Sequence, residues 1–228
     1  MTELNPAESN PTANGPAASN PTASRPAGPR RTRLSADERR ASILAAAVEV
    51  FAEHGYQRGK VSEVAARIGV TEPVVFQNFK SKAGLFTAVV AHAADRVCAE
   101  LDEAAAGVPV VALLTELTSP AHLDRLHARG AIGVLFADSV AATADPAVAE
   151  AGRAAVRRIA EGLAALLRRG QATGELRADT DPDAAAWLLI SLVSARPLRL
   201  AALPELSRDH IERELAAMTA QLIAPPGD

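Results

Sequence analysis

The most constraining feature of this sequence is a pair of helical patterns that meet at a glycine, between Val64 and Lys82. In VAARIGVTEPVVFQNFKSK, apolar residues recur at helical spacing, Gly69 interrupts them, and a second short helical pattern follows. Glycine readily takes the left-handed conformation that ends a helix, so we expect a tight turn from Gly69 to Thr71. Two helices joined in this way form a helix-turn-helix pattern, although many helical bundles also contain one.

The residues in front of this pair predict a supporting helix. Ser35 and Glu38 have the spacing of a capping box, in which each side chain accepts a hydrogen bond from the other's backbone N–H. We expect the helix to end at Gly55. Its apolar residues recur at helical spacing and are Ile43, Leu44, Ala47, Val48 and Phe51.

The third helix combines an apolar stripe, Val75 and Phe79, with a polar outer face. We expect Thr71 to cap it. The major groove of DNA is about 12 Å wide and admits one helix, whose amides can pair with adenine, carboxylates with cytosine and methyl groups with thymine. The residues predicted to contact DNA are Thr71, Glu72, Val74, Phe76, Gln77 and Asn78, with Lys60, Ser62 and Lys82 nearby and Arg30, Arg31 and Arg33 in front.

The charge of the chain is uneven along its length. Residues 25–82 hold eleven Lys or Arg against six Asp or Glu, whereas residues 83–228 hold thirteen against nineteen. This suggests that only the front meets a polyanion, although an uneven surface without function would give the same counts. Residues 1–33 are rich in Pro, Ala, Asn and Ser and repeat SNPTA, which predicts a disordered tail with a basic end.

The rest of the chain predicts further helices. Alanine and leucine dominate and aromatic residues make up 3%, so the sequence predicts an all-α protein. We expect a helix-turn-helix domain over 34–82 and a second helical domain over 83–225. Its helices should span about 83–106, 109–118, 120–129, 131–143, 146–169 with a stop at Gly170, then from 182 with an end or kink at Pro197, and 207–223.

One helical segment, Ala184–Ala195, is apolar on nearly every side and must be covered all round. Pairing with a second copy about a two-fold axis would cover it, and we favour this over an internal helix in a monomer. The candidates for lining a ligand pocket are residues that would equally suit a core, namely His92, Cys98, Phe136, Trp187 and Ser191.

Several classes of protein are disfavoured. A single cysteine, Cys98, allows neither an intrachain disulfide nor a cysteine zinc site, and His122 and His127 lack the spacing for one helical face. We find none of the common hydrolase, metalloprotease or nucleotide-binding motifs, and predict neither an enzyme nor a cofactor. The chain shows no signal-peptide pattern, and its longest apolar run is too short to cross a bilayer, so we expect a cytoplasmic protein.

Residues 39–86 resemble the DNA-binding domain of TetR-family transcriptional regulators. The matching stretches are ILAAAVEVFAEHGY (43–56), VSEVAARIGV (61–70) and VTEPVVFQNFKSKAGLF (70–86), in order and without a gap. The resemblance implies contacts to bases and backbone from the third helix, and a phosphate contact from Lys82. The chain departs from the family at Lys60, Val74 and Phe76, where the family usually has hydroxyl-bearing residues.

The resemblance also implies a homodimeric repressor with a small-molecule effector. GELRADTDPDAAAWLL (174–189) resembles the entry to a helix that the family uses in its dimer. We therefore expect binding to a pseudo-palindromic site and release when an effector tilts the helix that begins near Ala83. The alternative is a helical protein–protein adaptor, which would need the apolar helices but not the basic residues.

Overall fold

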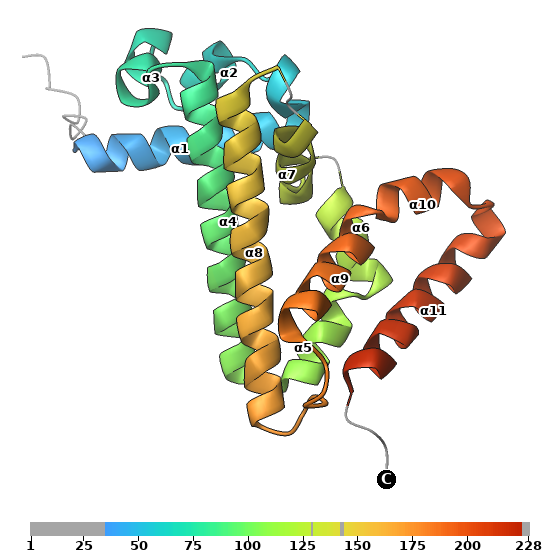
Figure 1. The fold of residues 1–228 in the computed structure, drawn as a ribbon. Coiled ribbons are helices and arrows are strands. Elements are labelled where there is room, and N and C mark those ends of the chain that lie inside the picture. The colour runs from blue at the N-terminus through green and yellow to red at the C-terminus, as the bar shows by residue number, and fades with distance from the viewer. Residues whose placement is uncertain (1–34, 129, 142–143, 225–228) are drawn as a thin grey trace, which may run out of the picture. The chain divides into compact units, whose positions relative to one another are not determined.

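The computed structural model describes residues 35–128, 130–141 and 144–224, which form eleven α-helices and no strand (Figure 1). This confirms the all-α prediction. The tail of residues 1–33, with Arg30, Arg31 and Arg33, lies outside the described residues. The helices are α1 (Ala36–Arg58), α2 (Val61–Arg67), α3 (Glu72–Phe79), α4 (Lys82–Gly107), α5 (Val110–Leu117), α6 (Pro120–His127), α7 (Ile132–Ala141), α8 (Pro146–Ala172), α9 (Pro182–Ser194), α10 (Arg196–Ala202) and α11 (Glu205–Ile223).

Helix α1 begins with the predicted capping box. The Ser35 N–H donates to Glu38 Oε2 at 2.8 Å, and the Glu38 N–H donates to Ser35 Oγ at 3.2 Å. The helix does not end at Gly55 as predicted. The backbone breaks there with φ +73° and the helix resumes through Arg58. A side chain at Gly55 would collide with the Asp138 carboxylate, so both the conformation and the close contact require glycine.

The turn between α2 and α3 closes as a Schellman motif. Gly69 has φ +68°, its N–H donates to the Ala66 carbonyl at 3.2 Å, and the Val70 N–H donates to the Ala65 carbonyl at 3.0 Å. Thr71 occupies the N-cap position of α3, but its side chain makes no cap hydrogen bond. The predicted side-chain cap is therefore wrong, although the predicted start of the helix is right.

The first four helices share one core with parts of α7 and α8. Ile43, Phe51, Val64 and Val75 are fully buried there, and the rings of Phe51 and Phe86 meet edge to face with centroids 5.0 Å apart. Burial of these side chains fixes α2 and α3 against α1 because each would otherwise leave an apolar face in water.

Two long helices, α4 and α8, lie side by side and connect this core to a second one (Figure 1). Leu85 and Phe86 of α4 belong to the first core, whereas Leu101 of α4 belongs to the second, with Leu166 and Leu167 of α8. Helix α8 runs past Gly170 to Ala172, so the predicted stop is wrong. Gly170 is instead a buried packing position against Leu176.

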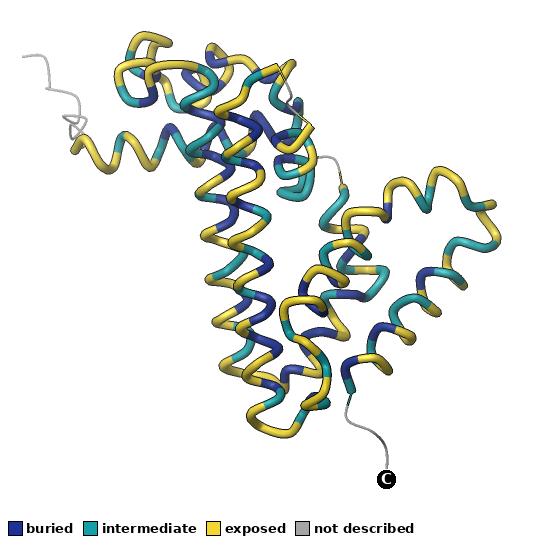
Figure 2. Tube along the Cα trace, viewed as in Figure 1, coloured by how far each residue is buried: buried dark blue, intermediate teal, exposed yellow. Residues whose placement is uncertain are grey.

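The C-terminal helices pack through a buried charged group. Pro197 lies in the first turn of α10, where the helical path bends between α9 and α10, as the predicted kink requires. Arg196 and Glu212 are 4% exposed and their Nε and Oε2 atoms are 3.1 Å apart, so α10 holds α11 by an ion pair. Figure 2 shows that much of α11 remains exposed. Met218 and Leu222 of this helix are 63% and 48% exposed.

No single helix among the described residues is long and apolar enough to cross a membrane. By length and composition, only α9 and α10 taken together pass that test, and they are bent by 43°.

Candidate DNA-binding interface and effector cavity

Helix α3 has one buried face and one exposed face. Val75 and Phe79 are buried, four residues apart, and hold the helix against the core. Gln77 is exposed on the opposite side, and Thr71 and Glu72 are exposed at the N-terminal end of the helix. This is the arrangement that reading base edges requires, because a helix must be held from behind while its outer side chains stay free.

The other predicted base contacts are less available. Val74 and Asn78 are half-buried, and the Asn78 side-chain amide donates to the Val74 carbonyl at 2.8 Å, one turn back on α3. Phe76 is 38% exposed and has no hydroxyl to offer a phosphate. The structure therefore brings Thr71, Glu72 and Gln77 together as the free polar groups of α3.

Arg40 of α1 fixes the end of α3, and the sequence analysis missed it. Its Nη1 donates to the Asn78 carbonyl at 2.7 Å, and its guanidinium carbon lies 4.2 Å from the centre of the Phe79 ring. A cation at the C-terminus of a helix also interacts favourably with the helix dipole. Nothing in the sequence marked Arg40, because its partner is 38 residues away.

Lysines flank α2 and α3. Lys60 and Ser62 are exposed at the start of α2, and Lys80 is exposed after α3 with φ +66°. Among the described residues, the ammonium groups of Lys60 and Lys80 have no ion-pair or hydrogen-bond partner. Arg67 differs, because it forms ion pairs with Glu49 at 2.7 Å and Glu53 at 2.6 Å. The ammonium groups of Lys60 and Lys80 are therefore free to meet phosphates.

Lys82 is held by the protein backbone. Its Nζ donates to the Gln57 carbonyl at 2.9 Å and lies 5.2 Å from the centre of the Tyr56 ring. Partial burial lowers the pKa of Lys82 from its usual value. The ammonium group is thus positioned in advance at the first turn of α4, rather than free in solvent.

The break in α1 connects this region to α7 and α8. The Tyr56 N–H donates to Asp138 Oδ2 of α7 at 2.9 Å, and the Tyr56 hydroxyl donates to Asp145 Oδ2 at 3.0 Å, just before α8. Burial and the hydrogen bond to Asp145 raise the pKa of the Tyr56 phenol. The end of α1 is therefore bonded directly to the second half of the chain.

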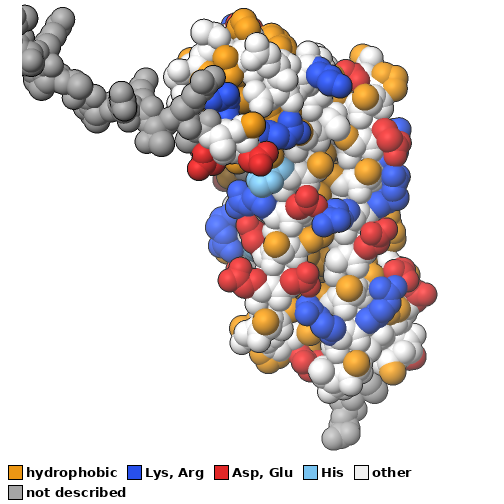
Figure 3. Space-filling model, turned by 90° about the vertical axis from the view of Figure 1, so that its left-hand side faces the viewer, with side chains coloured by type: hydrophobic (Ala, Val, Ile, Leu, Met, Phe, Trp, Pro, Cys, Tyr) orange, Lys and Arg blue, Asp and Glu red, His pale blue; other side chains and the backbone are white. Residues whose placement is uncertain are grey.

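The long face of α4 and α8 has a different electrostatic character. Figure 3 shows basic and acidic side chains interspersed over one side of the molecule. The ion pairs between these two helices include Arg158 with Asp95 at 2.7 Å and Arg169 with Asp102 at 3.6 Å. Paired charges of both signs give no continuous basic surface, so this face does not suit a polyanion.

A cavity of about 570 Å³ lies among α4, α6, α7, α8 and α9. Three of the five predicted pocket residues, Phe136, Trp187 and Ser191, line it, and His92 and Cys98 do not. Cys98 faces α8 instead, with its Sγ 3.6 Å from the Arg158 carbonyl oxygen. His127 also lines the cavity. It was not among the predicted pocket residues, because the sequence pattern drew attention to it only as a possible metal ligand.

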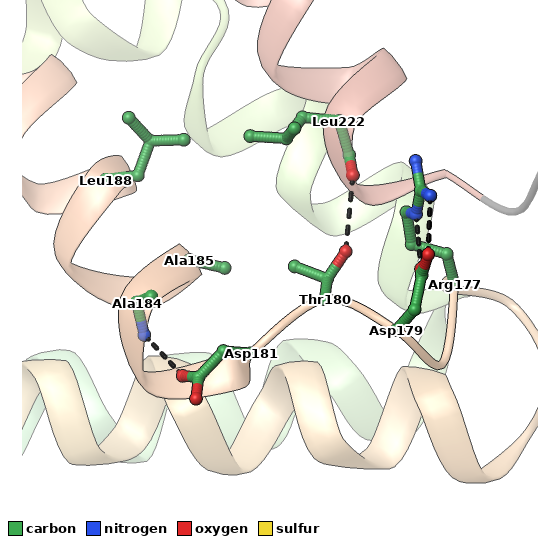
Figure 4. Close-up of a pocket in the computed structure, with 8 residues that line it drawn as sticks. All are labelled: Arg177, Asp179, Thr180, Asp181, Ala184, Ala185, Leu188 and Leu222. Carbon is green, nitrogen blue, oxygen red and sulfur yellow. Dashed lines mark hydrogen bonds and ion pairs between the residues drawn. The ribbon is translucent and has the colours of Figure 1, made fainter.

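A second, open hollow of about 360 Å³ lies where α9 begins and α11 ends (Figure 4). Leu188 and Leu222 face it from these two helices, and the ion pair of Arg177 with Asp179, at 2.6 Å, borders it. Among the described residues, no group of His, Cys, Asp and Glu could hold a metal ion.

Comparison with known proteins places both halves of the chain in one family. Residues 43–89 match the family model of bacterial regulatory proteins of the tetR family, and residues 140–218 match the tetracyclin repressor-like C-terminal domain. The chain therefore belongs to the TetR family of bacterial transcriptional regulators. This is a family of DNA-binding regulators rather than enzymes.

Two curated relatives differ in the direction of regulation. The chain is 43% identical over 75 residues to the HTH-type transcriptional activator FasR of Mycolicibacterium smegmatis. It is 36% identical over 64 residues to the HTH-type transcriptional repressor BepR of Brucella suis. The matches cover 33% and 28% of this chain, and 34% and 31% of those proteins, so only about a third of each relative's length is spanned.

The fold extends further than the sequence similarity. The structure of the regulator FadR from Bacillus subtilis in complex with stearoyl-CoA covers 80% of this chain and 98% of its own. It has a TM-score of 0.61 and 17% identity. At this identity the similarity concerns the fold alone.

Proposed function

We propose that this protein binds a pseudo-palindromic operator as a homodimer, with α3 of each copy in the major groove. The observation that carries the proposal is the two-sided character of α3, which is fixed by Val75, Phe79 and Arg40 and exposes Glu72 and Gln77. Gln77 has the chemistry to pair with adenine, and Glu72 to accept from the cytosine amino group. The TetR-family assignment favours this function over the adaptor alternative.

Lysines would hold the protein on the phosphate backbone. Lys60 and Lys80 are exposed, and Lys82 is positioned by its bond to the Gln57 carbonyl. The arginines at 30, 31 and 33 would add contacts from in front of α1. Each phosphate neutralised releases condensed counterions, so we expect the affinity to fall steeply as salt concentration rises.

Pairing of two copies would bury apolar side chains that one copy leaves in water. Leu188 of α9 is 41% exposed, and Met218 and Leu222 of α11 are 63% and 48% exposed. A two-fold interface through α9 and α11 would cover all three and place two α3 helices on one DNA site. The half-sites of such an operator would lie about one turn, roughly 34–36 Å, apart.

The cavity supports control by a small molecule. FadR is a regulator of the same fold whose structure holds stearoyl-CoA. In this chain, α7 lines the cavity with Phe136 and holds the end of α1 through Asp138. A ligand that shifts α7, or tilts α4 where Val97 borders the cavity, would change the position of α3. It must bind the released form more tightly than the DNA-bound form to do so.

The proposal also covers whether the protein represses or activates transcription, and where in the cell it acts. We propose repression, with release of the operator by the effector, in the cytoplasm. The relatives include both an activator and a repressor, so the family assignment alone is compatible with either sign.

The test is selection of bound sequences from random DNA duplexes by the purified chain. A recovered inverted repeat with centres about one turn apart would support both base reading and two-fold symmetry. Binding that is equal for all duplexes, or absent at low salt, would contradict the proposal.

A further inference from the structure

The chemistry of the effector cavity indicates what kind of molecule it takes, and this inference rests on the function proposed above. Among the described residues that line the cavity, none is a Lys, Arg, Asp or Glu, and most are aliphatic or aromatic. Arg196 and Arg199 lie one and two residues from Pro197, which lines the cavity, and both guanidinium groups are already bound to Glu212. An anionic ligand would therefore lose its hydration in the cavity without gaining a cation as partner.

The hydrogen bonds of the cavity wall define which polar atoms remain for a ligand. His127 Nδ1 lies 2.9 Å from the Leu123 carbonyl oxygen. A carbonyl oxygen can only accept, so Nδ1 carries the hydrogen, and in the neutral ring Nε2 is an acceptor. Among the described residues, no group bonds to Nε2. The imidazole thus offers an acceptor to whatever occupies the cavity.

The serines of the wall fit the same chemistry. The Ser191 hydroxyl donates to the Trp187 carbonyl at 2.7 Å, so its hydrogen is used and its oxygen lone pairs remain. Ser194 also lines the cavity, and its hydroxyl can rotate to donate or accept. The indole N–H of Trp187 can only donate. Two of the four polar side chains of the wall therefore call for a hydrogen-bond donor on the ligand.

We propose that the cavity binds an uncharged, mainly hydrocarbon molecule that bears a hydroxyl or similar group, which donates its hydrogen bond to His127 Nε2. The volume of about 570 Å³ suits a molecule of drug-like size. By the same chemistry the cavity discriminates against carboxylates of equal chain length, since these are anions that only accept hydrogen bonds.

The test uses the tryptophan that lines the cavity as its reporter. Trp187 is the only tryptophan in the chain, so its fluorescence reports on this site. The full-length protein is titrated with 1-decanol, decanoate and decyl methyl ether, which share one alkyl chain. We expect a saturable change with decanol, with decanoate about tenfold weaker or worse. Decyl methyl ether, which has no donor, should bind about three- to tenfold more weakly than decanol.

Two matched variants assign the preference to one side chain. His127→Leu should reduce decanol binding to the level of the ether. His122→Leu makes the same change on the same helix at a residue that does not line the cavity, and should keep the preference for decanol. Thermal unfolding of both variants checks that they are folded.

The inference is overturned if decanoate binds as tightly as decanol, if decanol gives no saturable response, or if His127→Leu keeps the preference. DNA binding measured on the same preparation separates this outcome from failure of the proposed function. A protein that selects an inverted repeat but ignores decanol contradicts only the ligand class, whereas one that selects no DNA contradicts the function itself.

Discussion

At the scale of single residues, the side chains that hold α3 in place are different from those that would contact the DNA bases. Arg40 bonds to the Asn78 carbonyl and stacks on Phe79, while Glu72 and Gln77 face solvent. Gln77 was predictable from the sequence, since helical spacing alone puts it opposite Val75 and Phe79. Glu72 lies three residues before Val75 and is exposed because it is the first residue of α3. Arg40 and Asp138 were not predictable, because their partners come from distant parts of the chain.

Replacing Gln77 by alanine should cost about 1–3 kcal/mol of binding free energy at one base pair of the operator. The reason is the loss of a bidentate amide contact, which discriminates among bases. Replacing Lys60 by alanine should instead weaken binding to all sequences alike and reduce the salt dependence. Competition assays with single-base operator variants measure both effects. An equal loss for Gln77→Ala on every duplex would rule out base reading by this side chain.

Replacing Gly84 by alanine should destabilise the protein by about 1–3 kcal/mol, because an added methyl group would collide with the Phe79 carbonyl oxygen at the end of α3. Gly107 provides a matched control on the same helix, since a methyl group there meets no atom within 4 Å. Gly107→Ala should be neutral or slightly stabilising. Urea unfolding measures both, and equal effects would show that the contact between α3 and α4 is not tight.

At the scale of helices, features that depend on hydrogen bonds within a few residues were predicted better than features that depend on distant contacts. The capping box at Ser35 and the turn at Gly69 were predicted correctly, because their hydrogen bonds lie within a few residues of each other. Gly55 and Gly170 were misread as ends. Both allow close approach of another segment, Asp138 in the first case and Leu176 in the second, and such contacts are absent from a local pattern.

Contacts between separate helices also explain the one buried carboxylate of α11, that of Glu212, which the local sequence pattern does not reveal. Burial by itself would raise the pKa of Glu212, but the hydrogen bonds and charges of Arg199 and Arg196 outweigh it and lower the pKa. A lowered pKa means that the ionised group stabilises the folded state above its unfolded pKa of about 4.5. That stability is lost as the pH falls through the lower folded pKa.

Replacing Glu212 by glutamine should therefore destabilise the protein by about 3 kcal/mol at neutral pH, because two guanidinium groups lose their shared partner. The difference from the unchanged protein should shrink below pH 4.5, where Glu212 itself becomes protonated. Urea unfolding over a pH series measures this. Glu214→Gln, at an exposed position on α11, should stay within about 0.5 kcal/mol. A difference that does not depend on pH would contradict the assignment.

At the scale of the whole molecule, one copy leaves large apolar side chains of α9 and α11 exposed to water. The sequence indicated this through the apolar run at Ala184–Ala195. The sequence could not indicate which of these side chains remain exposed to solvent, because their exposure depends on how α11 packs. Trp187 and Leu188 are 46% and 41% exposed, whereas Leu189 is buried.

Replacing Leu188 by aspartate should weaken the proposed dimer by about tenfold or more, because a charge would be buried at the interface. Sedimentation over a range of protein concentrations measures the dissociation constant. Val108→Asp is the control, since Val108 is 47% exposed but lies outside α9 and α11. If both variants behave as the unchanged protein does, the interface lies elsewhere.

The side chains that anchor α3 are not the ones that would contact bases, so the DNA target of such a regulator can change while its fold is kept. Arg40, Val75 and Phe79 hold the helix from one side, so substitutions at Glu72 or Gln77 cost little folding stability. A duplicated copy of this gene could thus acquire a new DNA target through a few surface exchanges, with its interior untouched.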